Sequence, residues 1–347
     1  MQYRILGNTD LQVSQICLGS LTFGQQSSEL ESHEQLDYAV DAGINFFDTA
    51  ELYPAPHKPE TYGESERIIG NWLASRKGRD QKILATKVVG PGKPATHIRN
   101  GQTHFTSKDI EEALNGSLKR LKTDYIDLYQ LHWPDRKTNG FGKLGFTYDL
   151  NEYATPIKET LESLSSIQKS GKIRHFGICN ETSWGTMEFL HQADKAGFPR
   201  IASIQNSYNL LDRTFEIGLS EIVYREKISL LAYSPLAFGV LSGKYLNGNK
   251  PSNSKLTFWE RQFSRYRKEN SEVATEAYVN LAQSYQIGPA QMALAFVGSR
   301  PFVTSMIIGA TTIGQLKENI STINITLPSE MKEGIEAIHR QFPNPCP

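Results

Sequence analysis

Eight short apolar runs recur along the 347-residue chain, and amphipathic helical patterns lie between them. Each run is rich in β-branched, aliphatic or aromatic residues and leads into a polar loop, which is the pattern of a buried strand. Strands that alternate with helices favour a parallel sheet covered by helices. Eight repeats favour closure of that sheet into a (β/α)8 barrel rather than a doubly wound sheet. The runs span residues 14–19, 44–48, 82–87, 125–133, 173–179, 202–206, 228–234 and 304–310.

The helical signals and the N-terminal segment agree with this fold class. Apolar residues recur at helical spacing from Ile110 to Leu121, and a similar segment ends before Gly171, a good helix terminator. The opening stretch YRILGNTDLQVS fits a β-hairpin with its turn near Asn8 and Asp10. We therefore expect an α/β protein, a (β/α)8 TIM barrel that forms a single domain over 1–347. An N-terminal hairpin precedes it, and long loops lie at its C-terminal face.

Composition excludes several classes of function. Lys and Arg number 37 and balance 37 Asp and Glu, so no basic field points to nucleic acid or to an anionic membrane. The N-terminal stretch lacks a charged-then-apolar signal pattern, and no apolar run is long enough to span a bilayer. Three scattered cysteines, Cys17, Cys179 and Cys346, do not suit a disulfide framework or a zinc site. We expect a reduced, cytoplasmic protein with no metal.

Polar residues stand at or just beyond the ends of successive apolar runs. In a barrel these ends meet at the carboxyl face, where chemistry occurs. Taken singly, each residue has a structural explanation, such as a self-contained ion pair, a core histidine or a strand-end cap. Their joint occurrence at one end favours a functional site. The residues are Asp48, Lys87, His132, Asn180, Gln205, Tyr233 and Ser234, and Gly309 ends the eighth run.

Several short motifs, in this order, resemble the aldo-keto reductase family over nearly the whole chain. They are LGSLTFG, DTAELY, ATK, LYQLHWPD, GICN, IQNSYNLL, LAYSPLAFGVLSGKY and IIGATTIGQLKEN. The resemblance is strongest to the bacterial reductases that are related to potassium-channel β subunits. It implies an NADP(H)-dependent oxidoreductase that reduces small aldehydes and ketones to alcohols.

The resemblance also implies four catalytic residues, Asp48, Tyr53, Lys87 and His132. Tyr53 would donate a proton to the alkoxide that forms when a reduced nicotinamide delivers hydride to a carbonyl carbon. A cationic Lys87 beside the phenol would lower the phenol's pKa, while Asp48 orients and balances the lysine. A neutral His132 would hydrogen-bond the substrate oxygen and hold it near the phenol.

Two tyrosines compete for the role of the acid. Tyr53 keeps a five-residue spacing from Asp48, whereas Tyr62 follows the insert PAPHKPET and keeps the YGESE entry to the next helix. We expect Tyr53 to be the acid because Tyr62 is tethered less closely to Asp48. Tyr62 then becomes, with Trp133, a candidate wall of the substrate pocket, or only a loop anchor. His57, within the insert, is expected to be solvated.

No GxGxxG opens a helix after a strand, so a Rossmann cofactor site is not expected. By resemblance, the cofactor lies across the barrel mouth, with Tyr233 against the nicotinamide and with Asn180 and Gln205 bonded to its carboxamide. Small residues after Tyr233 would let backbone amides reach the pyrophosphate. The helix that follows the eighth apolar run carries Gln315 in its early turns, and its N-terminus offers a site for the adenosine phosphate. The full predicted set is Gly19, Ser20, Leu21, Asp48, Cys179, Asn180, Gln205, Tyr233, Ser234, Pro235, Leu236, Gly239, Leu241, Ser242, Lys244, Gly309, Ala310, Thr311, Thr312, Gln315, Glu318 and Asn319.

Two features depart from the family pattern. Cys179 stands where many relatives have Ser, and a thiol is the poorer hydrogen-bond donor. The positions around Gly309 and Gln315 are uncharged where many relatives carry Lys and Arg, so NAD(H) stays open beside NADP(H). Three arginines of WERQFSRYRKE either supply the missing charge or form a solvated helix face. They are Arg261, Arg265 and Arg267.

The segment 134–155 is long and brings Phe141, Phe146, Tyr148 and Tyr153 towards the barrel mouth. Such a loop forms a substrate pocket or lid, or its aromatic residues pack on one another. The first reading suggests an apolar or aromatic carbonyl substrate.

Two other functions are compatible with these residues. One is a cofactor-binding regulatory subunit or redox sensor with slow turnover. The other is a barrel isomerase or lyase that uses Lys87 to form a Schiff base.

Overall fold

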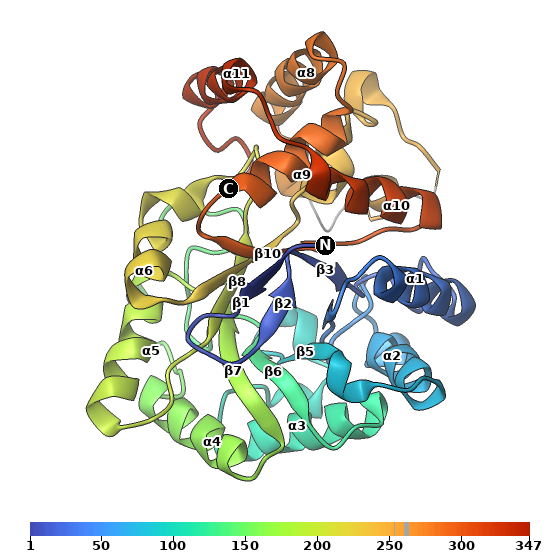
Figure 1. Cartoon of the computed structure of the whole chain (residues 1–347). Helices are drawn as coiled ribbons and strands as arrows, with labels where there is room; N and C mark the ends of the chain where they lie inside the picture. Colours follow the sequence, from blue (N-terminus) through green and yellow to red (C-terminus); the bar gives the residue numbers. More distant parts are fainter. Residues whose placement is uncertain (253, 260–263) are drawn as a thin grey trace.

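The chain folds into a closed barrel of eight parallel strands, in a computed structural model that describes residues 1–252, 254–259 and 264–347 (Figure 1). The prediction of a (β/α)8 barrel is therefore confirmed, and each of the eight apolar runs overlaps one barrel strand. The strands neighbour one another in chain order, and β10 closes the ring on β3. They are β3 (Ile16–Gly19), β4 (Phe46–Asp48), β5 (Ile83–Val88), β6 (Ile126–Leu131), β7 (Ile173–Cys179), β8 (Ser203–Ser207), β9 (Ser229–Tyr233) and β10 (Val303–Ile308).

The predicted hairpin is confirmed and precedes the first barrel strand. Strands β1 (Tyr3–Ile5) and β2 (Gln12–Ser14) pair antiparallel. The side chains of Leu6, Leu11 and Val13 are buried together with Phe46, Leu128 and other residues that point into the barrel. They close the amino end of the barrel with apolar contacts, so the opposite, carboxyl end is the one left open for a site.

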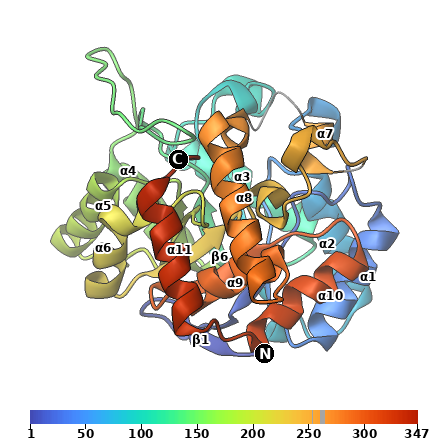
Figure 2. The same cartoon turned by 90° about the horizontal axis from the view of Figure 1, so that it is seen from above.

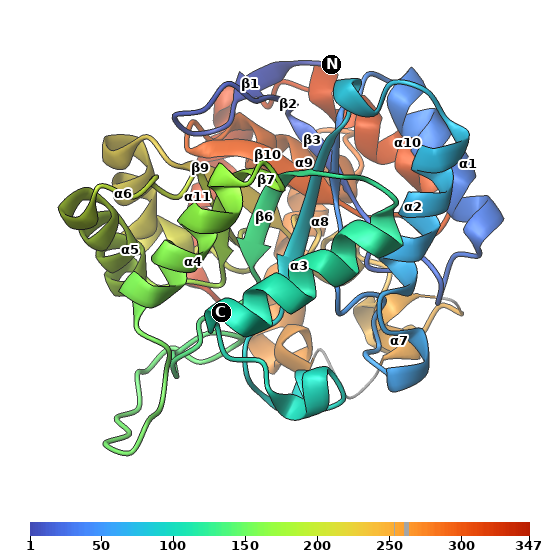
Figure 3. The same cartoon turned by 90° about the horizontal axis from the view of Figure 1, so that it is seen from below.

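Helices cover the outside of the barrel (Figures 1 and 3). In α3 the residues Ile110, Ala113, Leu114 and Leu121 face inward, and Thr106 caps the helix by accepting a hydrogen bond from the Asp109 N–H. Within the described residues, no helix is long and apolar enough to cross a membrane. The helices are α1 (Glu29–Asp41), α2 (Glu64–Ser75), α3 (Ser107–Leu121), α4 (Ile157–Lys169), α5 (Ser183–Ala196), α6 (Leu219–Glu226), α7 (Lys255–Phe258), α8 (Glu269–Ser284), α9 (Pro289–Ser299), α10 (Ile313–Ser321) and α11 (Ser329–Gln341).

Long loops gather at the carboxyl end of the barrel. The loop between β6 and α4 projects far from the body of the molecule in Figures 2 and 3. We call this loop the arm and its outer part, residues 144–150, the arm tip. The arm tip carries apolar side chains in solvent, and Leu150 is 99% exposed. The loop after β9 instead folds back over the barrel through a 3-10 segment (Ala237–Ser242) and α7.

The turn in that folded-back loop needs a glycine. Gly239 has a φ of +90°, and a Cβ at this position would lie 2.9 Å from the Lys244 Cε. An L side chain is strained in this backbone conformation, and the end of the Lys244 side chain would have to shift to admit it. The sequence therefore places a residue without a side chain where the chain turns beside Lys244.

Candidate active site

A buried ion pair lies at the carboxyl ends of two neighbouring strands. Lys87 on β5 donates hydrogen bonds from Nζ to Asp48 Oδ2 on β4 (2.5 Å) and to the Thr49 carbonyl (2.8 Å). Asp48 Oδ1 accepts from the side-chain amides of Gln205 (2.9 Å) and Gln130 (3.2 Å). Because both carboxylate oxygens are hydrogen-bonded, the protein compensates for removing these charges from water.

This environment keeps Lys87 charged. Burial by itself would lower the pKa of Lys87, but the Asp48 carboxylate and the Tyr53 phenol together raise it above its usual value. The lysine is thus an ammonium ion at neutral pH, with a fixed position beneath the barrel mouth.

Tyr53 lies against both Lys87 and His132. Lys87 Nζ is 4.9 Å from the centroid of the Tyr53 ring, and the His132 ring meets it edge-on at 5.6 Å between centroids. Burial raises the pKa of Tyr53 to about 12, although Lys87 acts in the opposite direction. Lys87 thus acts on the phenol's pKa in the expected direction, but desolvation is the larger effect and the net shift is upward. At neutral pH Tyr53 is protonated.

His132 is neutral at neutral pH. Burial, and secondly the charge of Lys87, hold the pKa of His132 well below its usual value. Its Nδ1 is buried, and within the described residues it has no hydrogen-bond partner. The neutral state expected from the sequence agrees with this environment.

A cavity of about 1580 Å³ opens above these residues. It is lined by Asp48, Tyr53 and His132 and extends towards the N-terminal end of α10. Five predicted cofactor residues do not line it: Ser20, Cys179, Leu241, Ala310 and Thr312. Predicted cofactor residues that do line it are Gly19, Leu21, Asp48, Asn180, Gln205, Tyr233, Ser234, Pro235, Leu236, Gly239, Ser242, Lys244, Gly309, Thr311, Gln315, Glu318 and Asn319.

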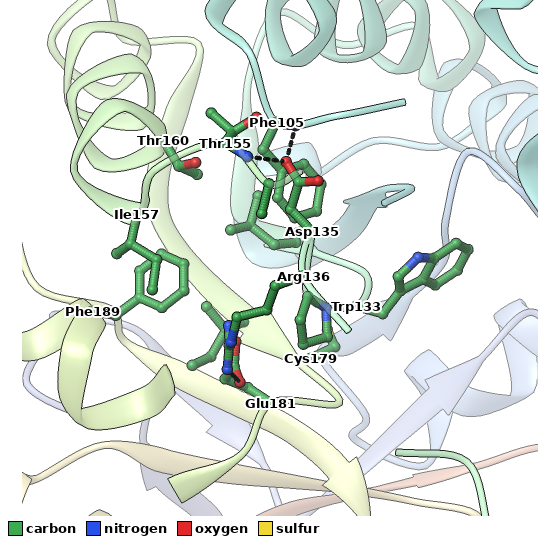
Figure 4. A pocket seen from close by; sticks show the side chains of 14 residues that line it. Phe105, Trp133, Asp135, Arg136, Thr155, Ile157, Thr160, Cys179, Glu181 and Phe189 are labelled. Carbon is green, nitrogen blue, oxygen red and sulfur yellow. Dashed lines mark hydrogen bonds and ion pairs between the residues drawn. The ribbon is translucent and has the colours of Figure 1, made fainter. Parts of the chain in front are cut away.

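Cys179 belongs to a different environment. Its thiol is buried and donates to Gln130 Oε1 (3.6 Å). It lines a second, small cavity of about 30 Å³ between the barrel and the loop after β6, shown in Figure 4. There Asp135 Oδ2 accepts hydrogen bonds from the N–H groups of Phe105 and Thr155 and so fixes the base of the arm.

Residues at the ends of β6, β7 and β9 are linked beside the large cavity. Tyr233 donates to Asn180 Oδ1 (2.7 Å), and Asn180 Nδ2 donates to the His132 carbonyl (2.8 Å). Asn180 and Ser234 both have φ near +55°, a conformation that is uncommon outside glycine. Residues held in such conformations often belong to functional sites.

Two lysines line the end of the cavity next to α10. Lys244 was predicted from the sequence, whereas Lys255 on α7 was not. Lys255 Nζ would lie 3.3 Å from a Cβ at Gly309, so a cation from another segment reaches this uncharged position. Burial, and secondly Lys244, lower the pKa of Lys255 to about 8. Within the part of the chain that the structure describes, neither lysine forms an ion pair.

Of the three arginines considered for that role, the two that the structure describes have other hydrogen-bond partners. Arg265 lines the cavity, but its guanidinium donates to Tyr266 Oη (2.7 Å) and Ser207 Oγ (3.4 Å). Arg267 donates to the carbonyl of Leu256. Arg261 lies outside the described residues.

The two candidate pocket residues have different positions. Trp133 lines the large cavity, and its Nε1 donates to the Pro91 carbonyl (2.9 Å). Tyr62 does not line it; its hydroxyl donates to Glu51 Oε2 (2.8 Å), so it is an anchor of its loop. His57 does line the cavity, and burial lowers its pKa, so the expectation that it is solvated was wrong.

The aromatic residues of the arm divide into two groups. Phe141 and Tyr153, on its two limbs, line the cavity. Phe146 and Tyr148 pack edge-on at 5.4 Å and are 58% and 85% exposed. Both expected arrangements, a pocket wall and mutual packing, therefore occur in different parts of one loop.

Gln130 is a functional candidate that the sequence reasoning missed. It pairs with Lys87 in the register of β5 and β6, and it donates to Asp48. A signal was available, since Gln130 lies two residues before His132 and so points to the same face of the strand.

The aldo/keto reductase family model matches residues 15–340. The chain is 48% identical over its full length to Protein tas of Escherichia coli (strain K12), all of which is covered. It is 33% identical to the uncharacterized oxidoreductase YrpG of Bacillus subtilis (strain 168), over 99% of this chain and 97% of that protein. It is 30% identical to a probable voltage-gated potassium channel subunit beta of Oryza sativa subsp. japonica, over 99% and 98% respectively.

Proposed function

Because the chain belongs to the aldo/keto reductase family, whose members are oxidoreductases acting on small carbonyl compounds, we propose that it reduces aldehydes or ketones to alcohols with NADP(H). The observation that carries the proposal is the protonated Tyr53 beside the buried Lys87–Asp48 pair and the neutral His132, with Asp48, Tyr53 and His132 lining one cavity. A proton donor, a fixed cation and an uncharged hydrogen-bond donor are the groups that carbonyl reduction needs.

The cavity suits a dinucleotide cofactor in size and in chemistry. Its volume of about 1580 Å³ exceeds that of an ordinary small-molecule site, roughly 300–1,000 Å³. Tyr233 and Asn180 line one end, and Lys244 and Lys255 line the other, which suits an aromatic amide at one end and phosphates at the other. When bound, the reduced nicotinamide would supply the hydride.

The side chains of this protein would supply the remaining steps. His132 would donate a hydrogen bond to the carbonyl oxygen and hold it next to the Tyr53 hydroxyl. Tyr53 would transfer its proton to that oxygen as negative charge develops. Lys87 would stabilise the phenolate left behind, and Asp48 would keep Lys87 in place.

The pair of lysines supports NADP(H) over NAD(H). The two dinucleotides differ by a 2′-phosphate, and a phosphate is recognised by cations. Lys255 lies beside Gly309, at the position that lacked a charge in the sequence, and has no ion-pair partner among the described residues. Burial of an ammonium group costs free energy unless an anion compensates for it, and NAD(H) would bring no 2′-phosphate to that position.

The Schiff-base alternative is disfavoured by the state of Lys87. A nucleophilic amine must be unprotonated, whereas Asp48 and Tyr53 raise the pKa of Lys87. Borohydride treatment with a carbonyl compound should therefore leave Lys87 unmodified.

A stopped-flow experiment tests the proposal. The protein is loaded with NADPH and mixed with a panel of aliphatic and aromatic aldehydes, and single-turnover oxidation is followed by absorbance. Tyr53→Phe should reduce the rate by about 10²–10⁴-fold, while Tyr224→Phe, a change on the surface where the side chain is 82% exposed, should have no effect. Negligible rates with every aldehyde would favour the slow regulatory subunit or sensor.

A further inference from the structure

One buried carboxylate joins the two loops that carry the candidate catalytic residues. Glu51 is fully buried and stands two residues before Tyr53. Its Oε1 accepts from the N–H of Val89 (2.8 Å), which stands two residues after Lys87. Its own N–H donates to the Lys87 carbonyl (3.1 Å). The side chain and the main chain of Glu51 thus hold the segment of Tyr53 against the strand of Lys87.

Two further side chains complete the coordination of this carboxylate. Arg99 donates through Nη1 to Oε2 (2.7 Å) and through Nη2 to Oε1 (3.0 Å), and its side chain is 7% exposed. Tyr62 donates to Oε2 (2.8 Å). The bidentate geometry fixes the angle as well as the distance between the two charged groups. We call Glu51, Tyr62 and Arg99 the Glu51 hub.

The backbone at Arg99 is held in an uncommon conformation. Arg99 has a φ of 45° and Asn100 a φ of 55°, in the left-handed region that non-glycine residues seldom adopt. Such a conformation is kept only where surrounding contacts determine it. The bidentate contact with Glu51 holds the side chain of Arg99, and the Arg99 carbonyl accepts from the N–H of Gln102 (3.0 Å).

The hub is continued by a second buried pair. Arg120 lies over the ring of Tyr62, 5.0 Å from its centroid, and donates through Nε to Glu66 Oε2 (2.7 Å). Glu66 accepts from Thr86, the residue before Lys87. The network begins and ends on the strand of Lys87, so it fixes that strand from both sides.

The same network positions two walls of the cavity. His57 and Pro59, between Tyr53 and Tyr62, line it from one side. Lys93 and His97, between Val89 and Arg99, line it as well, and the His97 ring meets the Tyr62 ring edge-on at 6.1 Å. Both walls end on the Glu51 carboxylate.

We propose that the Glu51 hub is a positioning device, which sets the place of the Tyr53 hydroxyl relative to Lys87 and the separation of the two cavity walls. The inference rests on the proposed reductase function. It also gives a role to Tyr62 beyond the insert, because its hydroxyl is the third donor to the Glu51 carboxylate, after the Val89 N–H and Arg99. Loss of the hub would misplace the proton donor, and a misplacement of about 1 Å costs about 100-fold in rate.

The test compares two buried ion pairs at opposite ends of the barrel. Arg99→Met breaks the hub. Arg79→Met breaks the pair between Arg79 Nη1 and Asp127 Oδ2 (2.9 Å), at the start of β6 and far from the cavity. For each variant we would measure single-turnover NADPH oxidation at saturating aldehyde, the NADPH Kd by fluorescence and the melting temperature.

Arg99→Met should slow the single-turnover rate about 100-fold and change the NADPH Kd less than about twofold. Arg79→Met should lower the melting temperature similarly and leave the rate unchanged. Arg99→Lys should recover only part of the rate, because an ammonium group cannot bond both carboxylate oxygens as the guanidinium does. If Arg99→Met lowered the melting temperature as much as Arg79→Met but left the rate unchanged, the inference would be overturned.

Tyr62→Phe keeps the test decisive if Arg99→Met does not fold, since it removes one hydroxyl. We expect a rate loss of about tenfold, and an unchanged rate would overturn the inference. Failure of the proposed function is distinguishable. In that case none of the aldehydes would cause the unmodified protein to oxidise NADPH, while Arg99→Met would still lower the melting temperature.

Discussion

At the scale of single residues, two opposing effects set the protonation state of Tyr53, the proposed proton donor. Burial raises the pKa of Tyr53, while the Lys87 ammonium opposes that rise. The phenol stays protonated at neutral pH, which is the form an acid needs. The cation then has its main effect as the proton leaves, because the phenolate is stabilised by a charge that is already in place.

The pH dependence of the reaction should follow this state. A general acid acts only while it is protonated, and the pKa of Tyr53 is raised to about 12. With saturating NADPH, we expect the rate of carbonyl reduction to stay level from about pH 7 to pH 10. The reverse oxidation of an alcohol needs the phenolate and should accelerate with rising pH over the same range. A reduction rate that falls by half near pH 8 or 9 would contradict this state of Tyr53.

Lys255 should set the preference between the two dinucleotides. Lys255→Met removes the cation beside Gly309, and we expect the NADPH Kd to rise about 10- to 100-fold, as for a charge-assisted hydrogen bond. The NADH Kd should change less than about twofold. Fluorescence titration measures both constants. Lys317→Met, on α10 but away from the cavity, is the matched control, and equal loss of both dinucleotides would argue against a phosphate contact.

The affinity for NADPH should itself depend on pH through the same residue. The pKa of Lys255 is lowered to about 8, so in the free protein the ammonium loses its proton as the pH rises through that value. NADPH should therefore bind less tightly above about pH 8, whereas NADH should not. Titrations at pH 7 and pH 9 on the unmodified protein and on Lys255→Met give the comparison.

At the scale of elements, the strands could be predicted from the sequence and the loops could not. Each barrel strand is an apolar run bounded by polar residues, and that pattern is local. The ends of those runs also identified Asp48, Lys87 and His132, because barrel geometry brings strand ends together. Lys255 could not be found in this way, since its place beside Gly309 depends on the path of a loop that folds back over the barrel.

The two tyrosines after Asp48 show the same limit. The five-residue spacing favoured Tyr53 as the acid, and spacing within one segment is visible in a sequence. The role of Tyr62 depends on Glu51 and Arg99, and the Arg99 contact arises from a different loop. A hydrogen bond between loops leaves no periodic signal, so Tyr62 was predicted only as a pocket wall or an anchor.

The loop after β6 offers a test at this scale. Phe141 lines the cavity, whereas Tyr148 on the arm tip is 85% exposed. Phe141→Ala should raise the KM for an aromatic aldehyde about three- to tenfold, because an apolar contact with the substrate is lost. Tyr148→Ala should leave KM unchanged. Steady-state kinetics with benzaldehyde and with acetaldehyde would check this, and an equal effect of both variants would contradict it.

At the scale of the whole molecule, the barrel is closed at its amino end and open at its carboxyl end. The hairpin residues Leu6, Leu11 and Val13 fill the closed end. The open end holds the cavity, which draws residues from β3 through α10. A ligand that fills this cavity contacts elements all around the ring and should therefore stabilise the fold as a unit.

The melting temperature should report this coupling. With NADPH at 100 times its Kd, binding to the folded state adds about 2.7 kcal/mol to the free energy of unfolding. For a chain of this length that corresponds to a rise in melting temperature of about 4 °C. Differential scanning fluorimetry over a range of NADPH concentrations measures it. NADH at the same concentration should give a smaller rise, and an equal rise would contradict the preference for NADPH.

The order of the site residues along the chain has a consequence for how such a protein can change. The four candidate catalytic residues lie between Asp48 and His132, while the two lysines and Gly309 lie beyond Tyr233. On the proposed function, substitutions in the first half would alter the chemistry or the substrate, and substitutions in the second half would alter the binding of the dinucleotide phosphates. Recombination between relatives at the loop after β7 would then exchange one property and leave the other intact.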